Sequence, residues 1–434
     1  MHVKHRQTCR VCGSRHLTPV IDLGEQYLQG SFIKPGRQDP PLRKLPMQLV
    51  RCDVSKDEGA CGLLQLAHTF PTEILYANYW YRSGVNETMR NHLKGIVTSA
   101  LSLVTKDRLR VVDIGCNDGT LLNNYPASFE RIGIDPSDIA AEIAPPIEVI
   151  NTGFPSERAT RTLAGRKADI VTSIAMFYDL EDPVGFAREI HDLLAPDGIW
   201  IFEMSYMPEM LRKNSLDTVC HEHLEYYSLA VIEFIMHRAG MRIFKAELND
   251  INGGSIRCYA SRAGTSRYDV AEARNFLQQL RFSEFELALD SDRPYLAFSS
   301  RITALRHELN SMLASLKAAG KKIHVYGAST KGNVLLQWCG IDNRMVDCAA
   351  DRNPDKYGAR TIGTDIPIVS EEESRALRPD YYLVLPWHFR EEFLRRERDT
   401  LAAGTRFIFP LPEISVIGIE QLAGGDNATT KSKG

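Results

Sequence analysis

The segment Val111-Val112-Asp113-Ile114-Gly115-Cys116-Asn117-Asp118-Gly119-Thr120 decides the fold of this chain. Its β-branched run ends at Asp113, and a Gly-x-x-x-Gly turn and a helix-like stretch from Thr120 follow. Asn117 stands where the dinucleotide motif has its second glycine, and the lysine of a phosphate loop is missing. A carboxylate at a strand end beside open N–H groups suits a cationic ligand that carries an amino acid better than a pyrophosphate.

A second strand-like run, 131–134, ends at Asp135, twenty residues after Gly115. An acid at this position is placed to bind ribose hydroxyls. The two acids together resemble the pattern of class I S-adenosylmethionine (SAM) methyltransferases; an α/β domain without a ligand is the alternative. The resemblance implies cofactor contacts from the residues around the strand tips: Asp113, Gly115, Asn117, Asp118, Asp135, Pro136, Phe154 and Ser173.

Strand-like runs alternate with helical patterns through the middle of the chain, at 110–114, 131–134, 147–150, 169–173 and 199–202. This alternation predicts an α/β fold with a doubly wound parallel sheet, and ligands at the carboxyl ends of its strands. A second strand, turn and helix pattern starts at Ile323 and predicts a Rossmann-like C-terminal domain. Between the two, a long helical region runs from 269 to 319 with a break at 290–294.

The composition is that of an ordinary globular protein. The 434 residues are 44% hydrophobic and 25% charged, and the net charge is −3. This balance gives no general attraction to nucleic acid or to a membrane surface, and no apolar run approaches the roughly 18 residues of a membrane span. The N-terminal residues lead into no secretory signal, so we expect a cytoplasmic protein that is a monomer or a weak homodimer.

Four cysteines predict a structural zinc site in the N-terminal region. Cys9 and Cys12 have the usual knuckle spacing, whereas Cys52 and Cys61 are separated by eight residues. Four thiolates can close a tetrahedral site that leaves no position for water. Disulfides and unliganded thiols are the alternatives, and His16 and His68 are substitutes for a thiolate.

The segment Asp217-Thr218-Val219-Cys220-His221-Glu222-His223 is the most chemically dense part of the chain. A metal site is disfavoured, because zinc-binding histidines on a helix are four residues apart and here they are two apart. An acid–base role is favoured, because imidazole titrates near neutrality and a neighbouring carboxylate can orient it. A structural hydrogen-bonded pair is the remaining alternative.

From Cys9 to Ile417 these motifs, in this order, resemble the three-domain sugar C-methyltransferases, SAM-dependent enzymes that build branched deoxysugars on nucleotide carriers. The resemblance implies a zinc-binding domain at 1–75, a methyltransferase core at 76–262 and a nucleotide-sugar-binding domain at 263–423, before a disordered tail at 424–434. It also implies that His223 is the catalytic base and that Glu222, beside His221, orients it.

Two positions depart from that family. Cys220 stands where a tyrosine often precedes the His-Glu-His segment, and Asp179 stands where a histidine often follows the fourth strand. Tyr226, Tyr79 or Tyr81 are candidates to replace the lost groups. These departures do not change the prediction of a methyltransferase, but they weaken the prediction of which bond the enzyme forms.

The resemblance and the local patterns together predict the substrate-binding residues Tyr79, Tyr81, Cys220, Asn252, Ser329, Lys331, Asn333, Asp351 and Arg352. Asn252 begins an Asn-Gly-Gly-Ser turn, and Lys331 lies at a helix start where an ammonium group and backbone donors suit a phosphate. A hairpin turn and a solvated helix terminus are the respective alternatives.

The expected reaction is methylation at C3 of a 4-keto-deoxysugar linked to dTDP or GDP, with SAM as donor and structural zinc. The keto group makes the neighbouring C–H acidic enough for a histidine to remove the proton. An O-methyltransferase acting on a nucleotide sugar and a non-catalytic nucleotide-sugar-binding protein are the alternatives.

Overall fold

The computed structural model describes residues 3–36, 43–70 and 81–425. The chain forms two compact units, each assembled from separated stretches of sequence. The first unit takes 1–20, 49–209 and 222–294, and the second takes 21–48, 210–221 and 295–434. The stretch 1–75 contributes to both units, and the stretch 263–294 belongs to the first. The predicted domain boundaries stay predictions.

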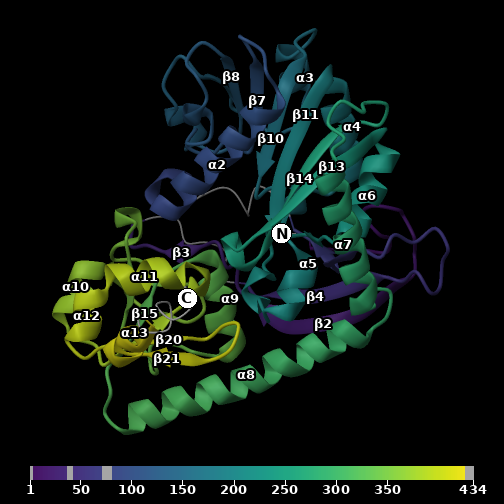
Figure 1. Cartoon of the computed structure of the whole chain (residues 1–434). Coiled ribbons are helices and arrows are strands. Elements are labelled where there is room, and N and C mark those ends of the chain that lie inside the picture. The colour runs from purple at the N-terminus through teal and green to yellow at the C-terminus, as the bar shows by residue number, and fades with distance from the viewer. Residues whose placement is uncertain (1–2, 37–42, 71–80, 426–434) are drawn as a thin grey trace, which may run out of the picture. The chain divides into compact units, whose positions relative to one another are not determined.

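A seven-stranded sheet is the core of the first unit, with the order β13-β14-β11-β10-β7-β8-β9 (Figure 1). The strands are β7 (Arg110–Ile114), β8 (Glu130–Ile134), β9 (Glu148–Ile150), β10 (Ala168–Ile174), β11 (Leu194–Ser205), β13 (Met241–Asn249) and β14 (Ser255–Arg262). β7 to β11 are parallel, and β14 runs antiparallel to both β11 and β13. The chain goes from β7 to β8 on one side and returns to β10 on the other, which places a topological switch point at the end of β7.

The helices of the first unit, except α7, begin after a polar side chain that caps their first turn. They are α2 (Glu87–Leu103), α3 (Glu157–Thr162), α4 (Pro183–Leu193), α6 (Leu229–Arg238) and α7 (Ala271–Leu287). Asp182 accepts from Gly185 N at 2.8 Å at the start of α4, where Pro183 takes the first helical position. The carboxylate of Glu284 on α7 accepts from the backbone N–H groups of Leu229 and Ala230 at the start of α6, and thereby ties α7 to this unit.

The helix expected after Thr120 is wrong: the chain makes only the 3₁₀ turn η2 (Leu122–Asn124). Two asparagines and then Pro126 follow the apolar pair of leucines. Asparagine is a weak helix former, and proline disfavours helical backbone in the residue before it, so the helix cannot continue.

A six-stranded sheet is the core of the second unit, with the order β18-β16-β15-β19-β20-β21. Its strands are β15 (Ile323–Tyr326), β16 (Ala349–Asp351), β18 (Ile368–Ser370), β19 (Tyr381–Val384), β20 (Arg406–Phe409) and β21 (Ser415–Ile417). All neighbours are parallel except β20 and β21. The predicted Rossmann-like fold is confirmed, with its switch point between β15 and β19.

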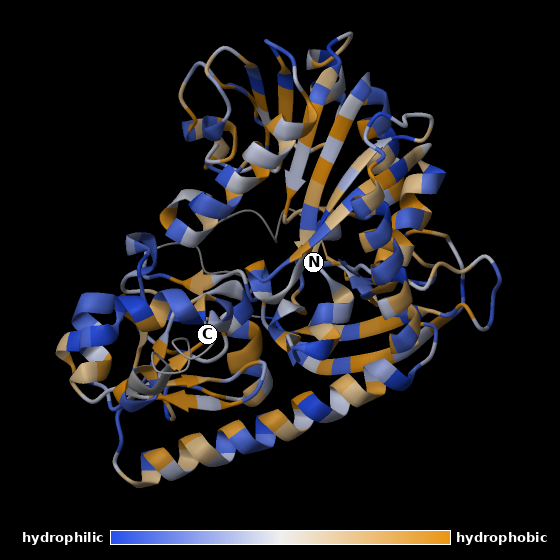
Figure 2. Cartoon of the chain, in the orientation of Figure 1, coloured by the Kyte–Doolittle hydropathy of each residue, from blue (hydrophilic) through white to orange (hydrophobic). Residues whose placement is uncertain are grey.

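The long helical region divides as predicted into α7 and α8 (Arg293–Ala318). In Figure 2, hydrophobic and hydrophilic residues alternate along α8, and its buried side chains recur every three or four residues, as at Ile302, Leu305 and Leu309. The other helices are α5 (Met207–Arg212), α9 (Thr330–Cys339), α10 (Glu371–Ala376), α11 (Arg390–Arg396), α12 (Arg398–Ala402) and α13 (Ile419–Gly425).

Strands from the N-terminal region form three small sheets, two of which include a strand from later in the chain, β12 or β17. Their orders are β12-β5-β4-β2, β1-β6 and β17-β3. The strands are β1 (Lys4–His5), β2 (Leu17–Gln26), β3 (Phe32–Ile33), β4 (Leu45–Cys52), β5 (Leu64–Leu66), β6 (His68–Thr69), β12 (Glu225–Tyr226) and β17 (Arg360–Thr361). Within the described ranges, no helix combines the length and the apolar character needed to cross a bilayer. The predicted tail from Gly424 lies almost entirely outside those ranges.

Candidate active site and metal centre

The four predicted zinc ligands meet in the first unit. Cys9 Sγ lies 3.6 Å from Cys61 Sγ, Cys12 Sγ lies 3.4 Å from Cys52 Sγ, and all four sulfur atoms lie within 4.8 Å of one another. Sulfur atoms bound to zinc at about 2.3 Å in a tetrahedron are about 3.8 Å apart, so this cluster has the size of a zinc site. The sulfur separations are far longer than the roughly 2.05 Å of a disulfide bond.

Local backbone geometry explains the spacing of these cysteines. A glycine with positive φ follows a ligand in each half, Gly13 after Cys12 at +79° and Gly62 after Cys61 at +82°. His16 and His68 do not join the cluster, which is the only group in the described part of the chain that has the composition and geometry of a metal site. Four thiolates fill the coordination sphere, so the zinc is structural.

The turn after β7 is wound tightly around three residues with positive φ: Gly115, Asn117 and Gly119. A Cβ at Gly115 would lie 3.1 Å from Met176 Cγ, and the φ of +77° at this residue favours glycine. The side chain of Asn117 accepts from Ser83 N at 2.9 Å, and Asp118 accepts from Gly84 N at 2.7 Å. These two predicted cofactor residues therefore anchor the segment before α2, and sequence patterns gave no sign of that role.

Asp135, at the tip of β8, is held by two backbone donors. Its Oδ2 accepts from Asn117 N at 2.9 Å, and its Oδ1 accepts from Ser137 N at 2.8 Å. Each carboxylate oxygen has a second lone pair, so the side chain can still accept from a ribose hydroxyl. Asn151 Nδ2 donates to the carbonyls of Asp135 and Ser137 and brings the end of β9 to the same place. Pro136 between them is exposed.

Asp113 is buried in β7, where Thr172 Oγ1 donates to its Oδ1 at 2.6 Å. Burial raises the pKa of this carboxyl to about 7, and the nearby Asp135 adds to the shift. A cation beside Asp113 would favour the ionised form. The sequence placed this acid at a strand end but could not identify Thr172 as its partner.

Two further predicted cofactor residues lie in aromatic surroundings. Phe154 is half-buried and meets Phe186 edge to face, with ring centroids 5.4 Å apart. Ser173 is fully buried, and its hydroxyl accepts from Trp200 Nε1 at 2.8 Å. The structure therefore assigns the hydroxyl of Ser173 to the interior of the sheet.

The His-Glu-His segment crosses the division between the two units, which falls between His221 and Glu222. His221 is fully buried in the second unit, with Nδ1 2.7 Å from Gln29 Oε1 and Nε2 3.4 Å from Leu45 O. A catalytic role for His221 stays a prediction. Cys220 beside it is also buried.

Glu222 and His223 belong to the first unit. Burial raises the pKa of the Glu222 carboxyl to about 7. The imidazole of His223 is 8% exposed and lies against the phenol ring of Tyr178, with centroids 4.1 Å apart. Glu222 as the group that orients His223 stays a prediction.

Lys331 of the second unit lies near the start of α9, where Ser329 Oγ caps the helix by accepting from Gly332 N at 3.0 Å. Its Nζ donates to Thr218 Oγ1 at 3.2 Å. Burial lowers the pKa of Lys331, and the attraction of Asp217 opposes that shift. An acid beside the ammonium group would compete with a bound phosphate, so the phosphate role stays a prediction.

Asp351 of the second unit repeats the arrangement of Asp135. Its Oδ2 accepts from Ala328 N at 2.9 Å, and its Oδ1 accepts from Asn353 N at 2.8 Å. Lys356 Nζ lies 3.3 Å away and partly balances its charge. Arg352 is exposed, whereas Asn333 is buried with its Nδ2 donating to Gln29 O at 2.7 Å.

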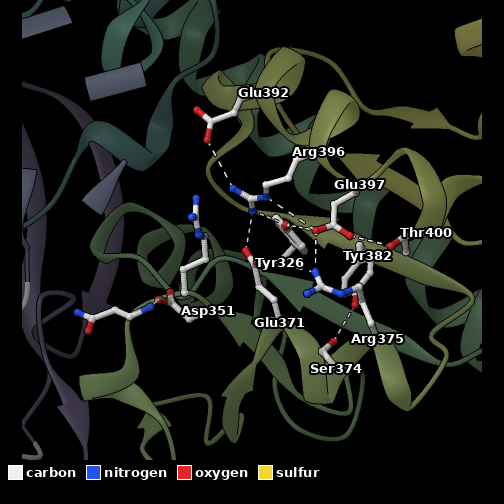
Figure 3. A network of polar contacts seen from close by, with 12 residues as sticks. Tyr326, Asp351, Glu371, Ser374, Arg375, Tyr382, Glu392, Arg396, Glu397 and Thr400 are labelled. Atoms are coloured by element: carbon white, nitrogen blue, oxygen red, sulfur yellow. Dashed lines mark hydrogen bonds and ion pairs between the residues drawn. The ribbon is translucent and has the colours of Figure 1, made fainter. Parts of the chain in front are cut away.

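A polar network lies close to this strand edge (Figure 3). Glu397 accepts from Tyr326 Oη at 2.9 Å and from Arg375 at 2.8 Å, while Arg396 contacts Tyr326 and pairs with Glu371 at 2.6 Å. Both guanidinium groups are paired with carboxylates. The network therefore holds α10 and α11 against β15 and does not form an anion site.

The remaining predicted substrate residues lie in the first unit. Asn252 has a φ of +56° in the 3₁₀ turn η6 (Ile251–Gly253) and is half-buried, and Tyr81 is 49% exposed. Tyr79 lies outside the described residues. Tyr226, a candidate for the lost tyrosine, is buried in β12.

Comparisons with known proteins agree along the whole chain. Family models match a zinc binding domain at 9–76, a methyltransferase domain at 85–246 and a C-methyltransferase C-terminal domain at 250–412. The C-methyltransferase NovU of Streptomyces niveus is 29% identical over 418 residues, which are 95% of this chain and 97% of NovU.

Solved structures match the methyltransferase part more weakly. A SAM-dependent methyltransferase from Clostridium acetobutylicum is 13% identical and covers 42% of this chain and 94% of its own, with a TM-score of 0.33. Magnesium protoporphyrin IX methyltransferase of Synechocystis with bound SAH is 15% identical and covers 42% and 90%, with the same TM-score. Similarities of this size add nothing to the identification.

The first unit, with its doubly wound sheet and two acid-tipped strands, is a class I SAM methyltransferase fold. The cofactors are SAM and a structural zinc ion held by four cysteines. The chain belongs to the three-domain C-methyltransferases, and its activity is SAM-dependent methylation of carbon.

Proposed function

We propose that this enzyme methylates C3 of a nucleotide-linked 4-keto-deoxysugar, with His223 as the base. The observation that carries the proposal is the position of His223 in the first unit. Its imidazole packs on Tyr178, and Met176, two residues earlier, lies over Gly115 of the cofactor turn. The segment 176–178 therefore contacts both His223 and the turn after β7.

The reaction follows from the chemistry of these groups. His223 accepts the proton from the carbon next to the keto group, and the electron pair of that C–H bond becomes an enolate. SAM supplies a methyl group on a positively charged sulfur. The enolate carbon forms the new C–C bond as the S–CH₃ bond breaks, and the proton on His223 passes to solvent. Asp113 and Asp135 bind the cofactor in this proposal. Desolvation raises the pKa of Glu222, the residue before the base in the sequence, to about 7.

The carrier nucleotide is assigned to the edge of the second sheet at Asp351, because this acid has the same two backbone donors as Asp135. Carriers with dTDP or GDP both present a sugar and hydroxyl groups to such an edge. Lys331 and Ser329 at the start of α9 complete the proposed nucleotide-sugar site.

The test uses the full-length zinc-loaded enzyme with SAM and two probes, dTDP-4-keto-6-deoxyglucose and GDP-4-keto-6-deoxymannose, in D₂O. We expect a mass gain of one methyl group on carbon. With SAH in place of SAM, recovered substrate should gain deuterium at C3, because the methylated carbon itself keeps no hydrogen. His223→Asn should lower kcat by about 10³-fold while the Kd for SAM stays within about twofold. His237→Asn, an exposed histidine on α6, is the matched control.

Two results would contradict the proposal. Near-normal turnover of His223→Asn would show that His223 is not the base. A methoxy product without deuterium exchange would identify an O-methyltransferase on the same kind of substrate.

A further inference from the structure

The turn η4 (Phe177–Asp179) contacts the segment that carries His223 at several points. Leu224 N donates to the carbonyl of Tyr178 at 2.8 Å, so the backbones of the two segments are joined one residue after the histidine. Phe177 stacks on Tyr227 with centroids 5.2 Å apart, and Tyr227 Oη, which donates to Glu225 at 2.9 Å, lies 3.4 Å from the carbonyl of Phe177. The segment that follows His223 is therefore held against η4 at two points.

The ring of Tyr178 completes these contacts. Its centroid lies 4.1 Å from that of the His223 imidazole, with a 48° angle between the ring planes. Tyr178 is 6% exposed and His223 is 8% exposed, so neither ring has room to swing into solvent. A tilted aromatic contact at this distance restricts the rotation of the imidazole about its own bonds.

The same turn is connected to the cofactor turn through the residues before it. Ala175, at the end of β10, has a φ of +55° and its N–H donates to the carbonyl of Glu203 at 2.8 Å. Met176 then lies against Gly115, where a Cβ would come within 3.1 Å of its side chain. A displacement of η4 would move the base relative to Gly115, because the two contacts come from Met176 and Tyr178, which are two residues apart.

We infer that Tyr178 is a positioning residue that holds the imidazole of His223 for proton abstraction. This inference rests on the proposed role of His223 as the base. Tyr178 is the residue of η4 whose ring contacts the imidazole of His223. The ring of Tyr178 acts through His223, so its replacement should change the rate of the chemical step and leave SAM binding intact.

The first experiment compares Tyr178→Phe with Tyr178→Leu in turnover of the keto-sugar that the wild type accepts. Tyr178→Phe keeps the ring and should retain at least about one third of kcat. Tyr178→Leu removes it and should lower kcat by about 10²-fold, the loss expected when a reacting group moves by about 1 Å. The Kd for SAM and the melting temperature serve as controls for a purely structural effect.

A double mutant separates action through His223 from an independent role. If Tyr178 acts only by positioning His223, adding Tyr178→Leu to His223→Asn should lower kcat no further. Additive losses, an equal loss in Tyr178→Phe, or a Tyr178→Leu rate within threefold of wild type would each overturn the inference.

A measurement without substrate keeps the inference testable if neither keto-sugar is turned over. In protein saturated with SAH and labelled at tyrosine and histidine, NMR should show a nuclear Overhauser effect between the rings of Tyr178 and His223, assigned with His223→Asn. The effect should persist in Tyr178→Phe. Its absence in the wild type would overturn the inference, whereas failure of turnover with this effect intact would count against the proposed substrate alone.

Discussion

SAM binding should depend on pH through Asp113. Burial holds the pKa of this carboxyl at about 7 in the enzyme without cofactor. A positively charged cofactor favours the carboxylate, so binding releases a proton wherever Asp113 is still protonated. If the bound-state pKa falls well below 6, the apparent Kd is inversely proportional to the ionised fraction of Asp113 in the free enzyme. The Kd should then be about eightfold weaker at pH 6.0 than at pH 7.5.

The assay is isothermal titration calorimetry in two buffers with different heats of ionisation. At pH 7.0 about half a proton should be released for each SAM bound, because Asp113 is half-protonated at its pKa. Asp113→Asn should bind SAM more weakly and lose this release. Glu222→Gln is the matched control, since Glu222 also has a pKa of about 7 and should leave the release unchanged. Equal proton release by Asp113→Asn and the wild type would refute the reasoning.

The pH dependence of folding stability has the opposite sign to that of SAM binding. A carboxyl whose folded-state pKa is raised stabilises the folded protein most when it is protonated. The free enzyme should therefore lose the contribution of Asp113 as pH rises from about 4 through 7, and SAM should restore stability most strongly above pH 7.

Two further predictions concern the scaffold. The purified protein should contain about one zinc ion per chain by mass spectrometry. Cys61→Ser should lose the metal and unfold at a lower temperature, whereas the control Cys339→Ala should keep the metal. Full zinc content in Cys61→Ser would contradict the four-thiolate site. Glu203→Gln should lower the free energy of unfolding in urea by about 3 kcal/mol at pH 7. Glu203 is buried, and its carboxylate oxygens lie 2.5 Å from His92 Nε2 and 2.8 Å from Arg257 Nε. Its pKa is lowered from 4.5 although burial opposes this, so its contribution is present above about pH 4.5 and is lost in acid; an equal cost at pH 3.5 would argue against an ionised pair.

Much of the cofactor and metal chemistry could be predicted because it depends on local backbone. Gly13 and Gly62 follow ligand cysteines because the chain turns through positive φ there, and the same reason places Gly115 and Gly119 after β7. Acids at strand tips are readable because parallel strands end on one edge of a sheet. The helix after Thr120 was predicted wrongly because a glycine turn followed by leucines resembles a helix start, while the following asparagines and Pro126 stop it.

The amino-acid sequence by itself determined two α/β sheets, the four zinc ligands and the acids at the strand tips, since each follows from residue type and spacing along one segment. Only the tertiary structure decided which groups meet across segments. It assigned Asn117 and Asp118 to the segment before α2, buried His221 against Gln29, and brought Tyr178 to His223. Such contacts join residues far apart in the chain, and side-chain direction is set by packing that no local pattern records.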